Sequence, residues 1–425
     1  MQHAHRLVVP RTWAWTWLLL VAFGLGACGY VREPAKGPVA GLPVPPKPTW
    51  PSNYTGLRAS RLDLPIKLDG DKPDHPSWTL TMVGEPVGQG WISWNGNAST
   101  PDPRNGAFPF RYSAWRSEPT ELLALVNHVE RLSALERKGE FMMRFSFWLP
   151  AAGQPKGIVI HQWGLGGAKY ERRIVDTLRA SGWAVLAYDG FTWEPPKQWL
   201  TPDASWAVDG ATGPGAAARR IAAEKAAAVV ARTTDDIVGQ YVLGVEAALT
   251  HVRRRFPSVA DSPLAVIGCS LGSLMTPALV TRLGGQVDAC VLVGSGVNLA
   301  QLSGKAWWNA AYSFVRTGGS KSLAMPAAER EHLFETYLEH ATLDPYHAAA
   351  ALRTVPTLML HARWDAIVPA SGGDVLWERA GRPERWSGNF GHLWMFLTLD
   401  GMADDIVAWI DATVARTGAA ASEGS

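Results

Sequence analysis

A serine between two glycines is the strongest chemical signal in the sequence. The run Leu264–Gly272 is apolar as far as Ile267 and then reads Gly-Cys-Ser-Leu-Gly, with Ser270 at the centre. Where a buried strand turns sharply into a helix, a serine projects its hydroxyl out of the sheet, and tiny residues two places on either side avoid a clash. The pattern therefore predicts that Ser270 is a nucleophile for attack on a carbonyl carbon.

A serine nucleophile needs an imidazole base and a carboxylate that orients the imidazole. Asp365 lies just beyond an apolar run, and His392 lies farther along in Asn-Phe-Gly-His-Leu. This order along the chain, serine, then acid, then histidine, resembles that of the α/β-hydrolases. We expect Ser270, Asp365 and His392 to form a catalytic triad.

Each of these residues also has a structural interpretation. Ser270 could cap a helix, Asp365 could be a turn or cap residue, and His392 could be a histidine of the core. The sequence also offers rivals for two of the roles, namely Asp344 and Asp374 for the acid and His347 and His361 for the base.

From about Phe141 to Arg416 the chain resembles an α/β-hydrolase. That family commonly has H-G-x-x-D-x-I-V-P after its penultimate strand, and this chain has H-A-R-W-D-A-I-V-P around Asp365, with Ala362 in place of the glycine. The family's catalytic histidine commonly follows a glycine, as His392 does. The resemblance implies acyl transfer to water without a metal or organic cofactor. A serine nucleophile argues against the dehalogenase and epoxide-hydrolase branches.

The resemblance also implies an oxyanion hole. One donor is the backbone N–H of Leu271, the residue after the nucleophile. The second comes from a loop that looks like the family's H-G-x-G and here reads His-Gln-Trp-Gly, which places the N–H of Trp163 at the oxyanion. Gln162 replaces the first glycine of that pattern, so the second donor is less firmly indicated than the first.

Tryptophan is unusually frequent, with 21 residues, and several lie close to the predicted site loops. We expect Trp193, Trp364 and Trp394, together with Trp163, to line a substrate pocket for a bulky apolar or aromatic group or a sugar ring. The alternative is that they pack beneath the loops. Three cations near the Ala-rich segment 216–231 could guide an acidic substrate, although a solvated helix face is the favoured interpretation; they are Arg219, Arg220 and Lys225.

The elements that must position these residues alternate between short apolar runs and longer amphipathic ones, which predicts an α/β class with a mostly parallel central sheet and helices on both faces. Predicted strands lie at Phe141–Leu149, Gly157–His161, Ala184–Tyr188, Leu264–Gly268, Ala289–Gly294, Thr357–His361 and near Glu384–Trp386. Predicted helices lie at Tyr170–Ser181, Asp235–Arg255, Gly272–Leu283, Asp374–Ala380 and Asp404–Arg416. Cys269 and Cys290 fall on strands that we expect to be neighbours, as buried free thiols.

The N-terminus indicates export. Arg6 and Arg11 precede an apolar stretch that fits a signal peptide over residues 1–27 and is too short to span a bilayer. It ends in Leu-Gly-Ala-Cys, which resembles the lipobox of bacterial lipoproteins and implies a lipid on Cys28. Gly29 would favour the outer membrane in a Gram-negative host, with the protein facing the periplasm. Residues 28–52 are rich in proline and are predicted to be an extended tether.

The rest of the chain divides at composition changes. Residues 53–140 are predicted to be an irregular N-terminal extension with a helix near Glu121–Arg137; a separate carbohydrate-binding module serving a glycan deacetylase is the alternative. Residues 141–416 form the catalytic domain, with lid insertions at about 191–234 and 297–346. A small-residue tail at 417–425 is expected to be disordered.

Charge excludes one class of partner. The chain has 40 Lys and Arg against 38 Asp and Glu, and the net charge becomes zero without the two leader arginines, so nothing points to nucleic acid. The sequence therefore predicts a membrane-tethered extracytoplasmic serine hydrolase acting on small-molecule or glycan esters. A peptidase or amidase with the same triad, and a non-catalytic lipoprotein that binds an envelope partner or glycan, remain alternatives.

Overall fold

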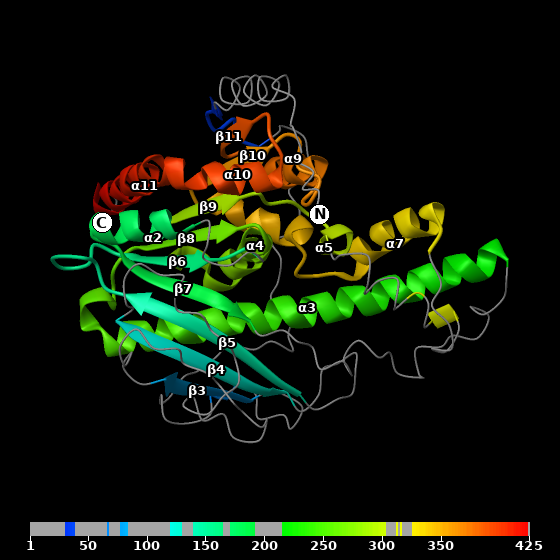
Figure 1. Cartoon of the computed structure of the whole chain (residues 1–425), viewed down its shortest axis with the longest axis horizontal. Coiled ribbons are helices and arrows are strands. Elements are labelled where there is room, and N and C mark those ends of the chain that lie inside the picture. Colours follow the sequence, from blue (N-terminus) through cyan, green and yellow to red (C-terminus); the bar gives the residue numbers. More distant parts are fainter. Residues whose placement is uncertain are drawn as a thin grey trace, which may run out of the picture.

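The computed structural model describes residues 30–38, 66–67, 77–83, 120–129, 139–164, 171–191, 215–302, 312, 315–316 and 325–423. One mixed sheet runs through these residues, with helices on both of its faces (Figure 1). The α/β class predicted from the sequence is confirmed.

The described strands are hydrogen bonded in the order β1-β11-β10-β9-β8-β6-β7-β5-β4-β3-β2. The strands from β6 through β11 are mutually parallel, whereas β2 to β5 and the edge strand β1 pair in antiparallel fashion. Their bounds are β1 (Val31–Glu33), β2 (Ile66–Lys67), β3 (Ser77–Val83), β4 (Glu121–Val129), β5 (Gly139–Trp148), β6 (Ile158–Gln162), β7 (Ala184–Phe191), β8 (Leu264–Cys269), β9 (Ala289–Val293), β10 (Thr357–Ala362) and β11 (Glu384–Gly388).

The seven predicted strands are all present, but the sheet starts earlier than expected. The helix predicted near Glu121–Arg137 is wrong over its first part, because Glu121–Val129 is strand β4. The residues of β4 suit either conformation, and the strand is fixed by pairing with β3 on one side and β5 on the other. Phe141 therefore lies within the second strand of an eight-strand unit, β4-β5-β7-β6-β8-β9-β10-β11.

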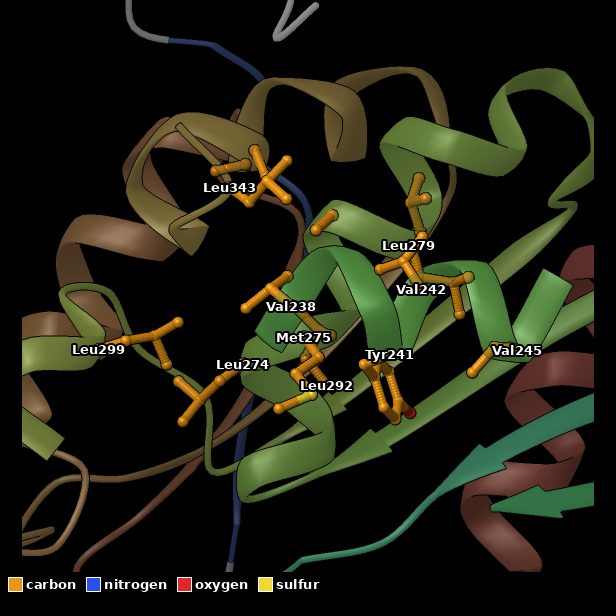
Figure 2. Close-up of a cluster of buried hydrophobic side chains, with 14 of the residues drawn as sticks. Val238, Tyr241, Val242, Val245, Leu274, Met275, Leu279, Leu292, Leu299 and Leu343 are labelled. Carbon is orange, nitrogen blue, oxygen red and sulfur yellow. The ribbon is translucent and has the colours of Figure 1, made fainter. Parts of the chain in front are cut away.

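The helices cover the sheet in two layers. Residues that alternate along a strand face opposite sides, so Ile158 and Ile160 of β6 face one core and Val159 faces the other. The first core is completed by α3, α4 and α9, and the second by α2, α10 and α11. Figure 2 shows the first core, where Tyr241 of α3 and Met275 of α4 meet.

The helix bounds are α2 (Arg172–Ala180), α3 (Ala216–Arg255), α4 (Leu271–Leu283), α5 (Leu299–Leu302), α7 (Ala327–His340), α8 (Pro345–Ala348), α9 (Ala370–Arg379), α10 (His392–Leu399) and α11 (Ala403–Glu423). Short 3-10 turns are Pro257–Val259, Gly284–Gln286, Ala349–Thr354 and Asp400–Met402. In the part of the chain described, none of the helices has the length and apolarity needed to span a membrane.

Helix α3 is a single helix of 40 residues, about 60 Å long, and it extends well past the sheet (Figure 1). The start predicted at Asp235 is therefore wrong, and the part of the expected lid from Ala216 to Thr234 is the first half of this helix. Asp235 lies inside this helix, and its carboxylate accepts two backbone hydrogen bonds. The donors belong to another segment: the Thr342 N–H lies 2.7 Å from Oδ2 of Asp235, and the Leu343 N–H lies 2.8 Å from Oδ1.

Both ends of the chain differ from expectation. Residues 30–38 are packed on the body and do not form a free tether: β1 pairs with β11, and the Lys36 N–H donates to the Arg382 carbonyl at 2.9 Å. The segment is held by pairing with the edge of β11, and the two prolines of the described stretch, Pro34 and Pro38, both follow β1. The disordered tail expected from Thr417 is instead helical as far as Glu423, because small residues such as alanine favour helix.

Candidate active site

Ser270 occupies the sharp turn between β8 and α4. Its backbone has φ 49° and ψ −115°, a positive-φ conformation that residues with a side chain rarely adopt. The flanking glycines are required by space: a Cβ on Gly268 would lie 2.2 Å from Oγ1 of Thr276, and one on Gly272 would lie 2.4 Å from the Gln162 carbonyl oxygen. The turn is therefore strained and tightly packed, which is a feature of functional sites.

The structure brings the three predicted triad residues together. Oγ of Ser270 lies 2.9 Å from Nε2 of His392, and Nδ1 of His392 lies 2.6 Å from Oδ2 of Asp365. An ionised Asp365 can only accept, so Nδ1 carries the proton and Nε2 presents its lone pair to the serine hydroxyl. The arrangement can therefore withdraw a proton from Ser270.

The acid is held rigidly by its own loop after β10. Oδ1 of Asp365 accepts the backbone N–H groups of Ile367 at 2.9 Å and Val368 at 2.8 Å. These bonds leave Oδ2 for His392. The Asp365 side chain is buried, so its contact with the imidazole is little screened by water.

The imidazole is confined by its neighbours. His392 is the first residue of α10, and its ring packs against Phe396 with 5.0 Å between ring centroids. Gly294, at the end of β9, approaches from the other side, and a Cβ there would lie 3.1 Å from Cε1 of His392. The ring is therefore positioned by packing as well as by Asp365.

The rival residues have other partners. Asp344 accepts the backbone N–H groups of Asn298 and Leu299, and Asp374 is exposed and paired with Arg385 at 2.7 Å. Of the histidines, His347 contacts the Leu338 carbonyl at 2.7 Å. His361 lies 3.8 Å from Asp374, and burial lowers its pKa.

The loop after β6 lies directly against the serine. The Trp163 carbonyl accepts the Gly272 N–H at 3.1 Å, and a Cβ on Gly164 would lie 2.9 Å from Cβ of Ser270. Leu271 is the first residue of α4, where backbone N–H groups have no partner within the helix. The two segments expected to supply oxyanion donors thus converge on Ser270. Residues 165–167 of the loop lie outside the described residues.

A buried polar group behind this loop has no counterpart among the sequence predictions. The carboxyl of Glu171 accepts the Gly164 N–H and the Cys269 thiol, and Oε2 of Glu171 lies 3.7 Å from Nε2 of His161. Burial raises the pKa of Glu171 to about 8 and lowers the pKa of His161 to about 3. Both side chains are therefore neutral at pH 7. No local motif marks Glu171; its position just before α2 is the one available signal.

His161, Glu171 and Cys269 are also the one group of three metal-ligating side chains that converges among the described residues, with ligand atoms within 4.8 Å of one another. Their types would suit a zinc ion. Burial also raises the pKa of the Cys269 thiol well above its ordinary value, so the surroundings favour the neutral forms of Cys269 and Glu171 over the anionic forms that bind a metal. Cys269 and Cys290 are buried free thiols on the adjacent strands β8 and β9.

The tryptophans predicted to line a pocket lie in different environments. Trp163 is buried, and its ring packs on His161 with 4.4 Å between centroids. Trp364 and Trp394 are exposed, one beside Asp365 and one on α10. Trp193 lies outside the described residues, as does Cys28.

Two of the three cations considered as guides for an acidic substrate pair with acidic side chains of the protein. Arg219 pairs with Glu329 of α7 at 2.8 Å, and Arg220 pairs with Glu224 one turn along α3 at 3.2 Å. These contacts match the interpretation as a helix face, with Arg219 joining α3 to α7.

The eight-strand order, the elbow at Ser270 and the positions of Asp365 and His392 after later strands define an α/β-hydrolase fold. No family model matches the sequence, and no curated protein matches it.

Solved structures similar to the chain include two esterases and an esterase domain. The Pyrococcus furiosus esterase Pf2001 has 14% identity and a TM-score of 0.37, covering 64% of this chain and 88% of that one. The esterase domain from a Rhodothermus marinus protein has 17% identity and a TM-score of 0.37, covering 69% and 100%. A zinc-bound cold-adapted esterase from an Arctic intertidal metagenomic library has 14% identity and a TM-score of 0.38, covering 71% and 99%.

Proposed function

We propose that the protein is a serine hydrolase that cleaves carboxylic esters through an acyl-enzyme. The observation that carries this proposal is the unbroken line of hydrogen bonds from Asp365 through His392 to Ser270. A strained serine backbone at the head of this line adds support, because a purely structural serine gains nothing from such a conformation.

The reaction follows from the geometry. Oγ of Ser270 attacks the ester carbonyl carbon while its proton passes to Nε2 of His392. The negative oxygen of the tetrahedral intermediate accepts the backbone N–H groups of Leu271 and Trp163. His392 then gives the proton to the departing alcohol, which leaves the acyl group on Ser270.

The second half of the reaction uses the same residues with water as the nucleophile. His392 takes a proton from the water as its oxygen attacks the acyl carbon, and returns that proton to Oγ of Ser270 as the acid departs. Asp365 remains ionised throughout and stabilises the imidazolium in both halves. No step requires a metal or an organic cofactor.

Labelling with a fluorophosphonate tests this proposal. Such a probe forms a covalent bond to an activated serine, so wild type is expected to be labelled and Ser270→Ala is not. Ser371 on α9 supplies the control: it is an exposed serine without a histidine partner in the described structure, so Ser371→Ala should label like wild type. Labelling that persists in Ser270→Ala would contradict the assignment.

The same triad also cleaves amides, and the leaving group decides between the two activities. Matched pairs of p-nitrophenyl esters and p-nitroanilides with the same acyl group separate them. We expect the ratio of kcat/KM for an ester to kcat/KM for the matching anilide to be at least as large as the ratio of their uncatalysed hydrolysis rates. A peptidase would instead show its highest kcat/KM on an extended anilide.

We also propose that Cys28 carries a lipid and that the enzyme is anchored outside the cytoplasm. The support is the lipobox-like Leu-Gly-Ala-Cys after an apolar leader. Incorporation of radiolabelled palmitate into the wild-type protein, and its loss in Cys28→Ser, tests this. An unlabelled wild type would contradict it.

A further inference from the structure

Five large apolar side chains are exposed on the described surface around the proposed active site. They are Trp364 (67%), Ile367 (53%), Leu393 (65%), Trp394 (42%) and Leu397 (58%), and we call them the apolar rim. Only two other large apolar side chains of the described residues are exposed, Val31 and Ile221. An exposed cluster of this kind marks an interaction surface more often than scattered single residues do.

The rim belongs to the same two segments as the acid and the base. Trp364 and Ile367 flank Asp365, while Leu393 directly follows His392. The Trp364 N–H donates to the Phe390 carbonyl at 3.1 Å, which joins the acid loop to the start of α10. Trp394 and Leu397 continue along that helix on its exposed face, whereas His392, Met395 and Phe396 lie on its buried face, so the apolar rim covers the outer side of the elements that carry the acid and the base.

The rim carries almost no charge. Over 363–369 and 392–399, the one exposed charged side chain is that of Arg363, since Asp365 is buried against His392. Tryptophan is enriched at membrane–water interfaces, and arginine is attracted to anionic headgroups. This composition matches a lipid surface better than a hydrated glycan, which would need polar partners.

The N-terminal strand leads to the same edge of the molecule. Val31 of β1 pairs with Ser387 of β11 in antiparallel fashion, so the chain before β1 emerges where β11 ends, close to His392 in the sequence. The ring of Tyr30 packs edge-on against Phe390, with 5.0 Å between centroids. Cys28 is two residues before Tyr30 in the sequence.

We propose that the apolar rim docks on a lipid bilayer and that the substrate is an amphiphilic ester whose acyl chain lies in that bilayer. This inference rests on the proposed function for its chemistry. A lipid on Cys28 would be attached two residues from Tyr30, which packs on Phe390, so the body stays at the membrane surface with the triad turned toward it. Ester groups of membrane lipids then reach Ser270 without crossing water.

The test uses the full chain bound to vesicles of phosphatidylcholine and phosphatidylglycerol. Hydrolysis of p-nitrophenyl palmitate in the vesicles is compared with hydrolysis of p-nitrophenyl acetate in solution. The double variant Leu393→Gln, Leu397→Gln leaves the proposed triad, oxyanion donors and tryptophans intact. Ile221→Gln on α3 is the matched control, because Ile221 is exposed and α3 packs on the opposite face of the sheet from α10.

The double variant is expected to lose about tenfold or more of the palmitate rate, because each apolar carbon withdrawn from lipid weakens membrane contact. Its acetate rate and the palmitate rate of Ile221→Gln should stay at the wild-type level. An unchanged palmitate rate in the double variant would overturn the inference while leaving the proposed function intact. The inference would also be overturned if the wild type sedimented as a dimer and the double variant as a monomer with no loss of the palmitate rate. The rim would then be the contact surface for a second copy of the chain.

A wild type that hydrolyses neither ester would contradict the proposed function. Membrane docking of the rim is then tested separately with a fluorescent label. A nitrobenzoxadiazole group on Leu397→Cys should be quenched by nitroxide-labelled lipid, whereas the same group on Ile221→Cys should not. The remaining described thiols, Cys269 and Cys290, are buried and do not compete. Equal quenching at both positions would overturn the docking.

Discussion

Asp365 divides its two carboxylate oxygens between its own loop and His392. Oδ1 accepts two backbone N–H groups of the loop, and Oδ2 lies 2.6 Å from Nδ1 of the imidazole. The loop therefore fixes the direction in which the second oxygen points, and His392 follows that direction. The consequence can be measured, because an amide in place of the carboxylate preserves the shape and removes the charge.

Asp365→Asn is expected to lower kcat for an ester by about 10⁴, because the amide favours the wrong tautomer of His392. Asp374→Asn serves as the control, since Asp374 is an exposed aspartate paired with Arg385 and should retain nearly full activity. Steady-state kinetics on a soluble p-nitrophenyl ester gives both values. A large loss in Asp374→Asn with little loss in Asp365→Asn would reverse the assignment of the acid.

Gly164→Ala should reduce kcat strongly while leaving the fold intact. The added Cβ would lie 2.9 Å from Cβ of Ser270, so the loop that carries the proposed oxyanion donor has to move away. Loss of one such donor typically costs about 10²-fold or more in kcat. Gly285→Ala is the control, because a Cβ there meets nothing within 4 Å. A wild-type kcat for Gly164→Ala would show that catalysis does not depend on the position of this loop.

Ser270 can be replaced by two residues that both remove the hydroxyl but differ in backbone freedom. Ser270→Gly should be more stable to urea than Ser270→Ala by about 1 kcal/mol, because glycine adopts φ 49° without strain. Both variants should be inactive. Equal unfolding midpoints for the two variants would mean that the turn relaxes once the serine is gone.

Glu171 gives stability a specific pH dependence. Its pKa is raised from 4.5 in the unfolded chain to about 8 by burial, so the folded protein binds the extra proton in that range and stability falls as pH rises through it. His161, with a pKa lowered to about 3, acts in the opposite sense only below 6.5. Between pH 6.5 and 8, therefore, only Glu171 of these two groups changes the free energy of unfolding, which falls by up to about 1.4 kcal/mol per pH unit.

Glu171→Gln should remove that slope, because the amide is neutral at every pH. Urea unfolding at pH 6.5 and pH 8 measures the difference for wild type, Glu171→Gln and the exposed control Glu331→Gln. The control should keep the wild-type slope. A Glu171→Gln protein that still loses stability over this range would place the responsible group elsewhere.

The central strands, and the gathering of the candidate site residues at one edge, are predictable from sequence. Fully buried parallel strands such as β8 and β10 are continuous apolar runs, and the residues after them meet at the carboxyl edge of the sheet. Ser270 and Asp365 are therefore placed by local patterns alone. Their proximity to His392 follows once the strands before these three residues are taken to lie parallel in one sheet.

Most of the incorrect predictions arise from contacts between parts of the chain that are separate in the sequence; the tail after Thr417 is the exception, since its alanines favour helix by themselves. The strand character of β4 comes from its pairing with β3 and β5. The carboxylate of Asp235 binds the Thr342 N–H, which is 107 positions away in the sequence. Glu171 has no neighbouring motif, since its role depends on Gly164 and Cys269. In each case the deciding partner cannot be identified from the local sequence.

The pairing of β1 with β11 also orders the assembly of the molecule in time. Glu33 and Arg385, which contact each other across this pair, are 352 positions apart in the sequence. This pairing is a highly non-local contact, and β1 cannot form it until the chain has been made as far as β11. Among the described strands, the first in the sequence therefore has to wait for the last before it can join the sheet.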